Sequence, residues 1–260
     1  MTTPPETAPG RIAAVLRALS RLPGATGTTS QIGRATGLAR PTAHRLLTAL
    51  AGEGFVDRDQ RSGAWFLGPE LYLLGGVAAQ RYDVVTQRAR GSVHRLAAAT
   101  GESAFFSARR GDETVCLLRE DGAFPIRSFV LHEGARFPLG VVSAGLVVLA
   151  MLPDAEVDDF LDRVDLTESY GPAHRPDAVR ALLAQTRELG YSVNPGLIVE
   201  GSWGMAAAVF DRSGAPAWAL TITGVESRFG DDRRPELGAL LLKEAHTLTQ
   251  ALRPGTSSHG

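Results

Sequence analysis

Four polar side chains within a six-residue stretch of the chain are of types that can contact DNA bases. They are Arg40, Thr42, His44 and Arg45. Arginine donates paired hydrogen bonds to guanine, and threonine can bond to several base edges. The apolar residues between them recur at helical spacing, and Pro41 suits the first turn of a helix because its missing N–H is not needed there. We therefore predict that this helix face, Pro41 included, contacts DNA.

A second helix must position this face, and the preceding residues predict one. Thr28 and Gln31 have the spacing of a capping box, Ile32 and Ala35 continue an apolar stripe, and Gly37 is a residue that ends helices. Two short helices joined in this way are typical of a helix-turn-helix, whose second helix enters the major groove. The helix start, Thr28, Thr29 and Ser30, would offer hydroxyls and amides to phosphate. The alternative is an αα-hairpin with a solvated polar face.

A β-hairpin should follow the two helices. Apolar residues at 55–56 and 65–67 bracket a polar turn that carries Arg58 and Arg61. Such a hairpin would be the wing of a winged helix, with both arginines on the DNA backbone or in the minor groove. Residues 1–68 contain eight arginines against four acidic residues, a net +4, whereas residues 69–260 contain 19 basic against 24 acidic residues, a net −5. The positive charge thus lies where phosphate binding requires it.

Catalysis or metal binding would be an alternative to DNA binding, and either would require a suitable set of side chains elsewhere in the chain. The six histidines have no metal-binding spacing, and Cys116 is the only cysteine, so a buried structural thiol is expected. The stretch Gly201-Ser202-Trp203-Gly204 lacks one glycine of a nucleophile elbow. Adjacent Asp231 and Asp232 point apart and do not form an acid pair. We predict that the protein is no enzyme and holds no metal or cofactor.

The chain is long enough for two domains. We expect a disordered tail over 1–10, a winged helix-turn-helix over 11–68, a linker helix over 69–82, an effector domain over 83–252 and a second disordered tail over 253–260. The linker helix has an exposed apolar face, which predicts pairing with a second copy and binding to a palindromic operator. No apolar run is long enough to span a membrane, and no signal peptide is present, so we expect a cytoplasmic protein.

The second half mixes helices and strands, which favours an α+β domain on an antiparallel sheet. We expect helices over 83–100, 142–152, 154–164, 176–189 and 233–252. Strands are expected over 103–108, 114–119, 126–131, 205–210 and 217–224.

Residues 11–252 resemble a known family of proteins, the IclR-type transcriptional regulators. The resemblance lies in 36–38, His44-Arg45-Leu46-Leu47, 54–56, 134–139, 189–191 and Thr221-Ile222-Thr223-Gly224. It implies a winged-helix DNA-binding domain, a linker helix and a GAF-like effector-binding domain, assembled as homodimers or dimers of dimers. Whether such a protein represses or activates transcription is left open by the sequence.

The resemblance also implies a pocket for a small metabolite between the sheet and the start of the apolar helix. The effector-binding residues would be Gly140, Val141, Val142, Ser143, Ala144, Leu146, Asn194, Gly204, Thr221 and Thr223. This chain departs from the family pattern: Gly140 replaces a usual histidine, Leu146 a lysine, Asn194 an aspartate and Gly204 a cysteine, and Thr221 and Thr223 replace serines. We expect an organic or aromatic acid, or a related compound, that is larger or less acidic than a small oxoacid.

The alternative is a second domain that only oligomerises. Val141, Val142, Leu146 and Trp203 are bulky enough to fill the former pocket. A ligand-binding pocket should have a volume of about 300–1,000 Å³, whereas a filled one would be far smaller.

Overall fold

The computed structural model of the chain describes residues 7–126 and 130–253. By its internal contacts the chain divides into two compact units, Met1–Tyr82 and Asp83–Gly260. Among the residues that the structure describes, no helix combines the length and apolar composition needed to cross a membrane.

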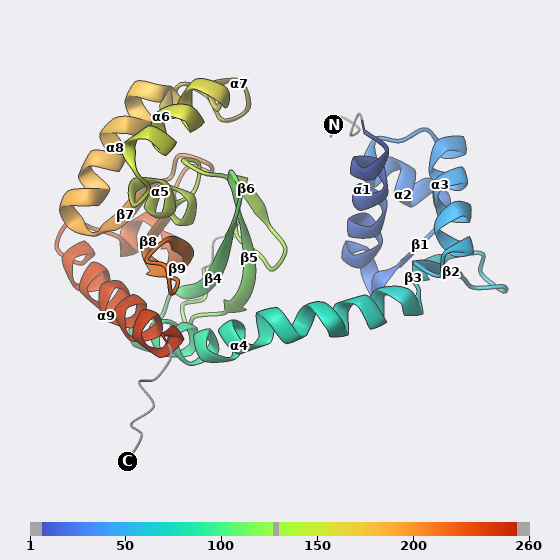
Figure 1. The fold of residues 1–260 in the computed structure, drawn as a ribbon, viewed down its shortest axis with the longest axis horizontal. Coiled ribbons are helices and arrows are strands. Elements are labelled where there is room, and N and C mark those ends of the chain that lie inside the picture. Colours follow the sequence, from blue (N-terminus) through green and yellow to red (C-terminus); the bar gives the residue numbers. More distant parts are fainter. Residues whose placement is uncertain (1–6, 127–129, 254–260) are drawn as a thin grey trace, which may run out of the picture. The chain divides into compact units, whose positions relative to one another are not determined.

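The first unit is a winged helix (Figure 1). It contains helices α1 (Ala8–Arg21), α2 (Thr29–Thr36) and α3 (Arg40–Gly52), and strands β1 (Thr26–Gly27), β2 (Val56–Arg58) and β3 (Trp65–Leu67). The strands form an antiparallel sheet in the order β1-β3-β2. Its core consists of Val15, Leu19, Ile32, Leu38, Ala43, Leu47, Leu50, Val56 and Trp65. The predicted helix-turn-helix and wing are therefore confirmed.

Three details of this unit differ from the predictions. Helix α1 begins at Ala8, because the Thr7 hydroxyl accepts a hydrogen bond from the Gly10 amide and caps it, so residues 8–10 are not a tail. Ala35 is exposed, and the buried face of α2 consists of Ile32, Gly33 and Thr36. Strand β1 was not predicted, since two residues carry no periodic signal.

Helix α4 (Pro69–Thr100) is one continuous helix of 32 residues. We predicted a linker helix that ends at Tyr82 and a separate helix from Asp83, and this break is absent. Residues 80–84 contain neither glycine nor proline, so nothing in the local sequence ends the helix. The division between the two compact units nevertheless falls within it, after Tyr82.

The second unit is built on an antiparallel sheet, as expected for an α+β domain. Within the described residues its strand order is β6-β5-β4-β9-β8-β7. The strands are β4 (Ser103–Arg110), β5 (Glu113–Glu120), β6 (Arg136–Pro138), β7 (Tyr191–Pro195), β8 (Ser202–Phe210) and β9 (Pro216–Val225). Of the strand predicted over 126–131, residues 127–129 lie outside the described residues, and Ile126, Val130 and Leu131 are not in a strand. Instead β6 pairs with β5, and β7 was also missed.

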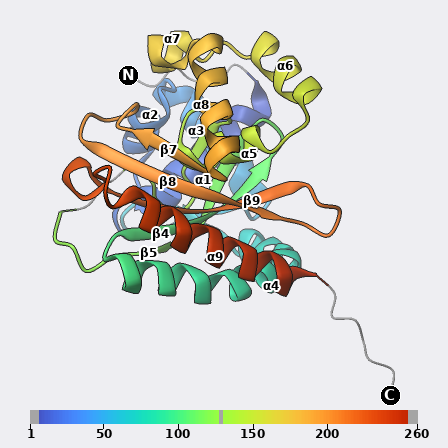
Figure 2. The same cartoon turned by 90° about the vertical axis from the view of Figure 1, so that its left-hand side faces the viewer.

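Helices cover both faces of this sheet (Figure 2). The C-terminal part of α4 and α9 (Arg234–Leu252) pack on one face, where Val93, Leu96, Leu237 and Leu241 share a core with the strands. The other face carries α5 (Ser143–Ala150), α6 (Asp154–Arg163), α7 (Thr167–Tyr170) and α8 (Pro176–Leu189). All eight residues of α5 are buried, so it lies sandwiched between the sheet and α8. Its N-terminus meets strands β7, β8 and β9, where the predicted effector residues converge.

Candidate DNA interface and effector pocket

The start of α2 is held by the predicted capping box. The Gln31 amide donates to the Thr28 hydroxyl at 3.3 Å, and the Gln31 side-chain oxygen accepts from the Thr28 amide at 2.8 Å. The Thr29 hydroxyl accepts a hydrogen bond from the Trp65 indole at 3.0 Å, which ties α2 to the wing. Ser30 is exposed at the second position of the helix. Thr28 and Thr29 thus use their hydroxyls within the protein, and Ser30 is the hydroxyl turned to solvent.

The predicted recognition face of α3 is exposed. Arg40, Pro41, His44 and Arg45 are exposed and Thr42 is half-buried. Ala43, Leu47 and Leu50 are buried on the opposite side of the helix and fix its orientation. The His44 ring lies edge-on to Trp65 with 6.2 Å between ring centroids. The helix therefore presents two arginines, a histidine and a threonine to solvent from a rigid base.

The wing carries both predicted arginines near its tip. Arg58 donates through Nε to the Gly63 carbonyl at 3.2 Å, and its guanidinium lies 5.3 Å from the Trp65 ring centroid. Asp59 accepts hydrogen bonds from the Ser62 amide and hydroxyl and from the Arg61 amide, and these bonds, Ser62's foremost, lower the pKa of its carboxyl. The turn is thereby ordered, with the Arg61 side chain exposed on it.

Sequence reasoning missed Arg34. This exposed residue in the last turn of α2 lines a surface recess of about 830 Å³ together with Ser30, Gly37 and Arg40. The structure thus brings Ser30 and Arg40, predicted on separate helices, into one recess with a third polar residue between them. The signal was present in the sequence, since Ser30 and Arg34 are four residues apart and share a helix face.

In the second unit, one rung of the sheet carries three predicted effector residues. Asn194 on β7 pairs with Gly204 on β8, Gly204 pairs with Thr223 on β9, and Thr223 pairs with Ser103 on β4. This rung ends beside Val142 and Ser143 at the start of α5. The cavity between them is lined by Val130, Leu131, Val142, Ser143, Asn194, Ile198, Ser202, Trp203, Gly204 and Thr223. None of these residues is charged.

Five of the ten predicted effector residues do not line this cavity. Gly140 has a φ of +82°, and a side chain there would meet Leu166 and Val179. Val141 contributes its carbonyl, which accepts a hydrogen bond from the Asn194 amide at 2.8 Å. Ala144 and Leu146 are fully buried in the core that α5 forms with the sheet and the neighbouring helices. Thr221 is buried two residues before Thr223 on the same face of β9.

The cavity is small, about 20 Å³, which is room for about one water molecule. Val142 and Trp203, two residues predicted to be able to fill it, belong to its wall. In this conformation the volume is that expected of a filled pocket and not of one that holds a metabolite.

The polar groups at the cavity and directly beside it are nevertheless unusual for a filled core. The hydroxyls of Thr221 and Thr223 are buried and have no hydrogen-bond partner among the described residues. The N-cap of α5 is Val142, whose side chain cannot accept from the first helix amides. Buried polar groups normally find a partner, so this corner has unused capacity for a ligand or water.

The described part of the chain holds no group of three or more histidine, cysteine, aspartate or glutamate side chains placed to bind a metal ion. The Cys116 thiol is buried, and burial together with the charge of Glu133 raises its pKa to about 12. It is therefore not poised as a nucleophile.

Known proteins resemble the chain over nearly its whole length. Residues 77–250 match the family described as bacterial transcriptional regulator IclR C-terminal, and residues 8–60 match the IclR helix-turn-helix domain. The transcriptional repressor AllR of Salmonella typhimurium is 30% identical over 241 residues, covering 92% of this chain and 87% of that protein.

Two solved structures share the fold. An IclR transcriptional regulator from Alicyclobacillus acidocaldarius is 26% identical with a TM-score of 0.74, covering 93% of this chain and 96% of that one. An IclR homologue from Microbacterium hydrocarbonoxydans, crystallised in complex with 4-hydroxybenzoate, is 24% identical with a TM-score of 0.72, covering 93% and 97%.

Proposed function

The chain belongs to the IclR family of bacterial transcriptional regulators, and on that premise we propose that it represses transcription from a palindromic operator under the control of a small molecule. It is a DNA-binding regulator and not an enzyme. The observation that carries the proposal is the exposed face of α3, which presents Arg40, His44 and Arg45 on a buried apolar base.

The DNA contacts divide by chemistry. Arg40, Thr42, His44 and Arg45 meet base edges in the major groove, and Pro41 lies with them at the helix start. The amides of Thr29 and Ser30, which follow the Thr28 cap at the start of α2, and the Ser30 hydroxyl bind phosphate, because a helix N-terminus favours anions. Arg34 adds a phosphate contact beside Arg40. Arg58 and Arg61 hold the wing on the DNA backbone.

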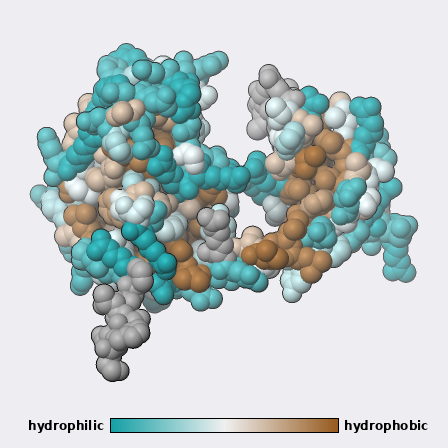
Figure 3. Space-filling view, in the orientation of Figure 1, coloured by the Kyte–Doolittle hydropathy of each residue, from teal (hydrophilic) through white to brown (hydrophobic). Residues whose placement is uncertain are grey.

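The protein acts as a homodimer or a dimer of dimers. The N-terminal half of α4 exposes apolar side chains, among them Tyr72 at 83%, Val77 at 68% and Leu73 at 60%, and Figure 3 shows apolar surface there. Such a surface is normally covered by a partner, and a second copy would place two recognition helices on one palindrome.

The effector binds at the start of α5, between Ser143, Asn194, Gly204 and Thr223. Support comes from the unpartnered threonine hydroxyls and from the uncapped α5 N-terminus, which suits a carboxylate or phenolate. The relative crystallised with 4-hydroxybenzoate favours an aromatic acid or a related compound. Because the cavity has room for only about one water molecule, the effector must select a more open conformation.

A thermal-shift screen tests this function. Purified protein is heated with aliphatic acids, aromatic acids including 4-hydroxybenzoate, and lactones. The proposal predicts stabilisation of several degrees by one class, abolished in Asn194→Ala and Thr223→Val. If no compound shifts the melting temperature of a protein that still binds a palindromic duplex, the second domain only oligomerises.

A further inference from the structure

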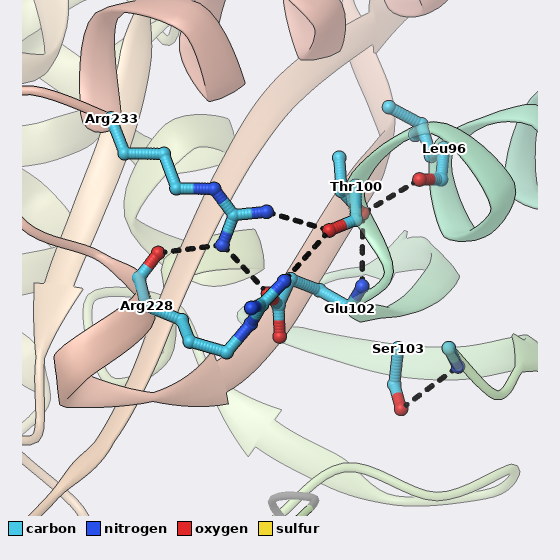
Figure 4. Close-up of polar contacts among 7 residues, drawn as sticks. Leu96, Thr100, Glu102, Ser103, Arg228 and Arg233 are labelled. Atoms are coloured by element: carbon cyan, nitrogen blue, oxygen red, sulfur yellow. Dashed lines mark hydrogen bonds and ion pairs between the residues drawn. The ribbon is translucent and has the colours of Figure 1, made fainter. Parts of the chain in front are cut away.

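One acidic side chain is buried between α4 and the loop that precedes α9. Glu102 follows the end of α4 and its side chain is 1% exposed. Its Oε1 atom accepts hydrogen bonds from Arg228 and from Arg233, the latter at 2.8 Å (Figure 4). Both arginines come from the segment between β9 and α9, about 130 residues later in the chain. Buried ion pairs are weak evidence for stability, because removing the charges from water offsets much of their attraction.

The same two arginines cap the C-terminus of α4. The Thr100 carbonyl accepts from Arg233 at 2.6 Å and from Arg228 at 3.2 Å. The last carbonyls of a helix lack intrahelical partners and carry the negative end of the helix dipole, so two guanidinium groups are well placed there. Glu102 thus holds both guanidinium groups beside the last turn of α4.

On its other side Glu102 contacts the strand that lines the effector pocket. Its Oε2 atom lies against the backbone of Gly224, where even a methyl side chain would overlap it. Gly224 directly follows Thr223 of the pocket rung, and the fourth member of that rung is Ser103, the residue after Glu102. A shift of the rung therefore changes the space available to the Glu102 carboxylate.

We propose that Glu102 is a positioning residue that couples the effector pocket to α4. Widening the rung at Gly204 and Thr223 moves Gly224 against the Glu102 carboxylate. The carboxylate then shifts Arg228 and Arg233 from the Thr100 carbonyl, and the last turn of α4 loosens. The coupling passes through contiguous contacts, from the Gly224 backbone to the buried Glu102 carboxylate and from there to the two arginines. This inference rests on the proposed function, because α4 also contains the proposed dimerisation segment.

The test replaces the unknown effector by a methyl group in the pocket. In Gly204→Ala, the added carbon would lie 2.9 Å from the Ser143 hydroxyl, which is too close, so either that hydroxyl or the rung must shift. Its 3.5 Å distance to a Thr223 methyl is ordinary contact. The readout is hydrogen exchange at residues 96–104 of the full-length protein, where the Gly101 amide bonds to the Ala97 carbonyl. Gly204→Ala is compared in the wild-type background and in Glu102→Gln.

A second ion pair whose glutamate is buried provides the matched control. Glu244 of α9 accepts from Arg95 of α4 at 3.0 and 2.7 Å, so it also joins α4 to another element. Glu244→Gln therefore removes a comparable charge without altering the contact at Gly224. If Glu102→Gln does not fold, Arg233→Gln takes its place, since that side chain is 29% exposed and its loss leaves Arg228 on Glu102.

We expect Gly204→Ala to raise exchange at Gly101 and Glu102 by at least about threefold in the wild-type and Glu244→Gln backgrounds. In the Glu102→Gln or Arg233→Gln background the added effect should fall to less than about 1.5-fold. The same fold-change in all backgrounds, or none in the wild type, would overturn the coupling. Neither DNA nor effector enters the measurement, so a failure of effector sensing is seen separately in the thermal-shift screen.

Discussion

The side-chain amide of Asn194 donates a hydrogen bond to the carbonyl of Val141 at 2.8 Å, and so joins β7 to the segment that leads into α5. The Asn194 side-chain oxygen accepts from the Leu197 amide at 3.0 Å. Both halves of this buried amide are therefore used in fixing one wall of the proposed effector pocket. An aspartate at this position could keep the second bond but not the first.

Asn194→Asp should destabilise the protein by about 2 kcal/mol, because a carboxylate would face the Val141 carbonyl in a buried site. Chemical denaturation followed by circular dichroism measures the loss. Gln87→Glu makes the same chemical change at an exposed position of α4 and should alter stability by less than about 0.5 kcal/mol. Equal effects of the two substitutions would show that the Asn194 hydrogen bond contributes nothing.

The bond from the Trp65 indole to Thr29 should couple the wing to α2. Thr29→Val leaves the indole N–H without its partner and should cost about 1–2 kcal/mol. In Trp65→Phe the donor is already gone, so adding Thr29→Val should cost about 1 kcal/mol less than it does alone. Thermal unfolding of the two single variants and the double variant completes the cycle. If the loss of stability in the double variant equals the sum of the losses in the two single variants, the hydrogen bond does not contribute.

Cys116 should be inert in the native protein. Burial, with the Glu133 charge, raises the pKa of its thiol to about 12, so almost no thiolate is present at pH 8. We expect no reaction with a disulfide reagent until denaturant is added, and one thiol per chain afterwards. Rapid labelling of the folded protein would show that the surrounding core opens readily.

Glu244 should make the second domain sensitive to acid. Burial opposes its charge, but hydrogen bonds from Arg95 and Ser92 outweigh that effect and lower its pKa below the usual 4.5. Its stabilising contribution is therefore complete above 4.5 and is lost as the pH falls through the lowered folded-state pKa. Unfolding of Glu244→Gln should depend less on pH than that of the wild type below pH 4.5. If the stability of the variant and that of the wild type change with pH in the same way, the Glu244 carboxylate makes no such contribution.

Helices and strands could be predicted best from the sequence where the residues that define their ends lie close by in the chain. The Thr28 capping box, Gly37 and Pro41 lie within a few residues of the helix ends they define, so α2 and α3 could be placed closely. The continuity of α4 could have been predicted, since no glycine or proline interrupts residues 80–84 and a boundary between two compact units does not require the end of a helix. Strands β6 and β7 were missed since three and five residues show little periodicity, and their pairing is set by distant strands.

The proposed effector site was predicted less completely for the same reason. Asn194, Gly204 and Thr223 share one rung, which follows from strand register and not from spacing along the chain. Gly140 and Leu146 are near the pocket in sequence, yet they pack into the core around α5. The cavity volume, and the role proposed for Glu102, depend on side-chain packing that no local pattern contains.

DNA binding by the α3 face is the central claim, and duplex affinity tests it most directly. A palindromic duplex is first selected from random sequences, and dissociation constants of the wild type, Arg45→Ala and Arg61→Ala are measured on it and on a scrambled duplex. Arg45→Ala should lose about 1–3 kcal/mol on the selected duplex and much less on the scrambled one, whereas Arg61→Ala should weaken both alike. Wild-type affinity of both variants for both duplexes would contradict the assignment of this face.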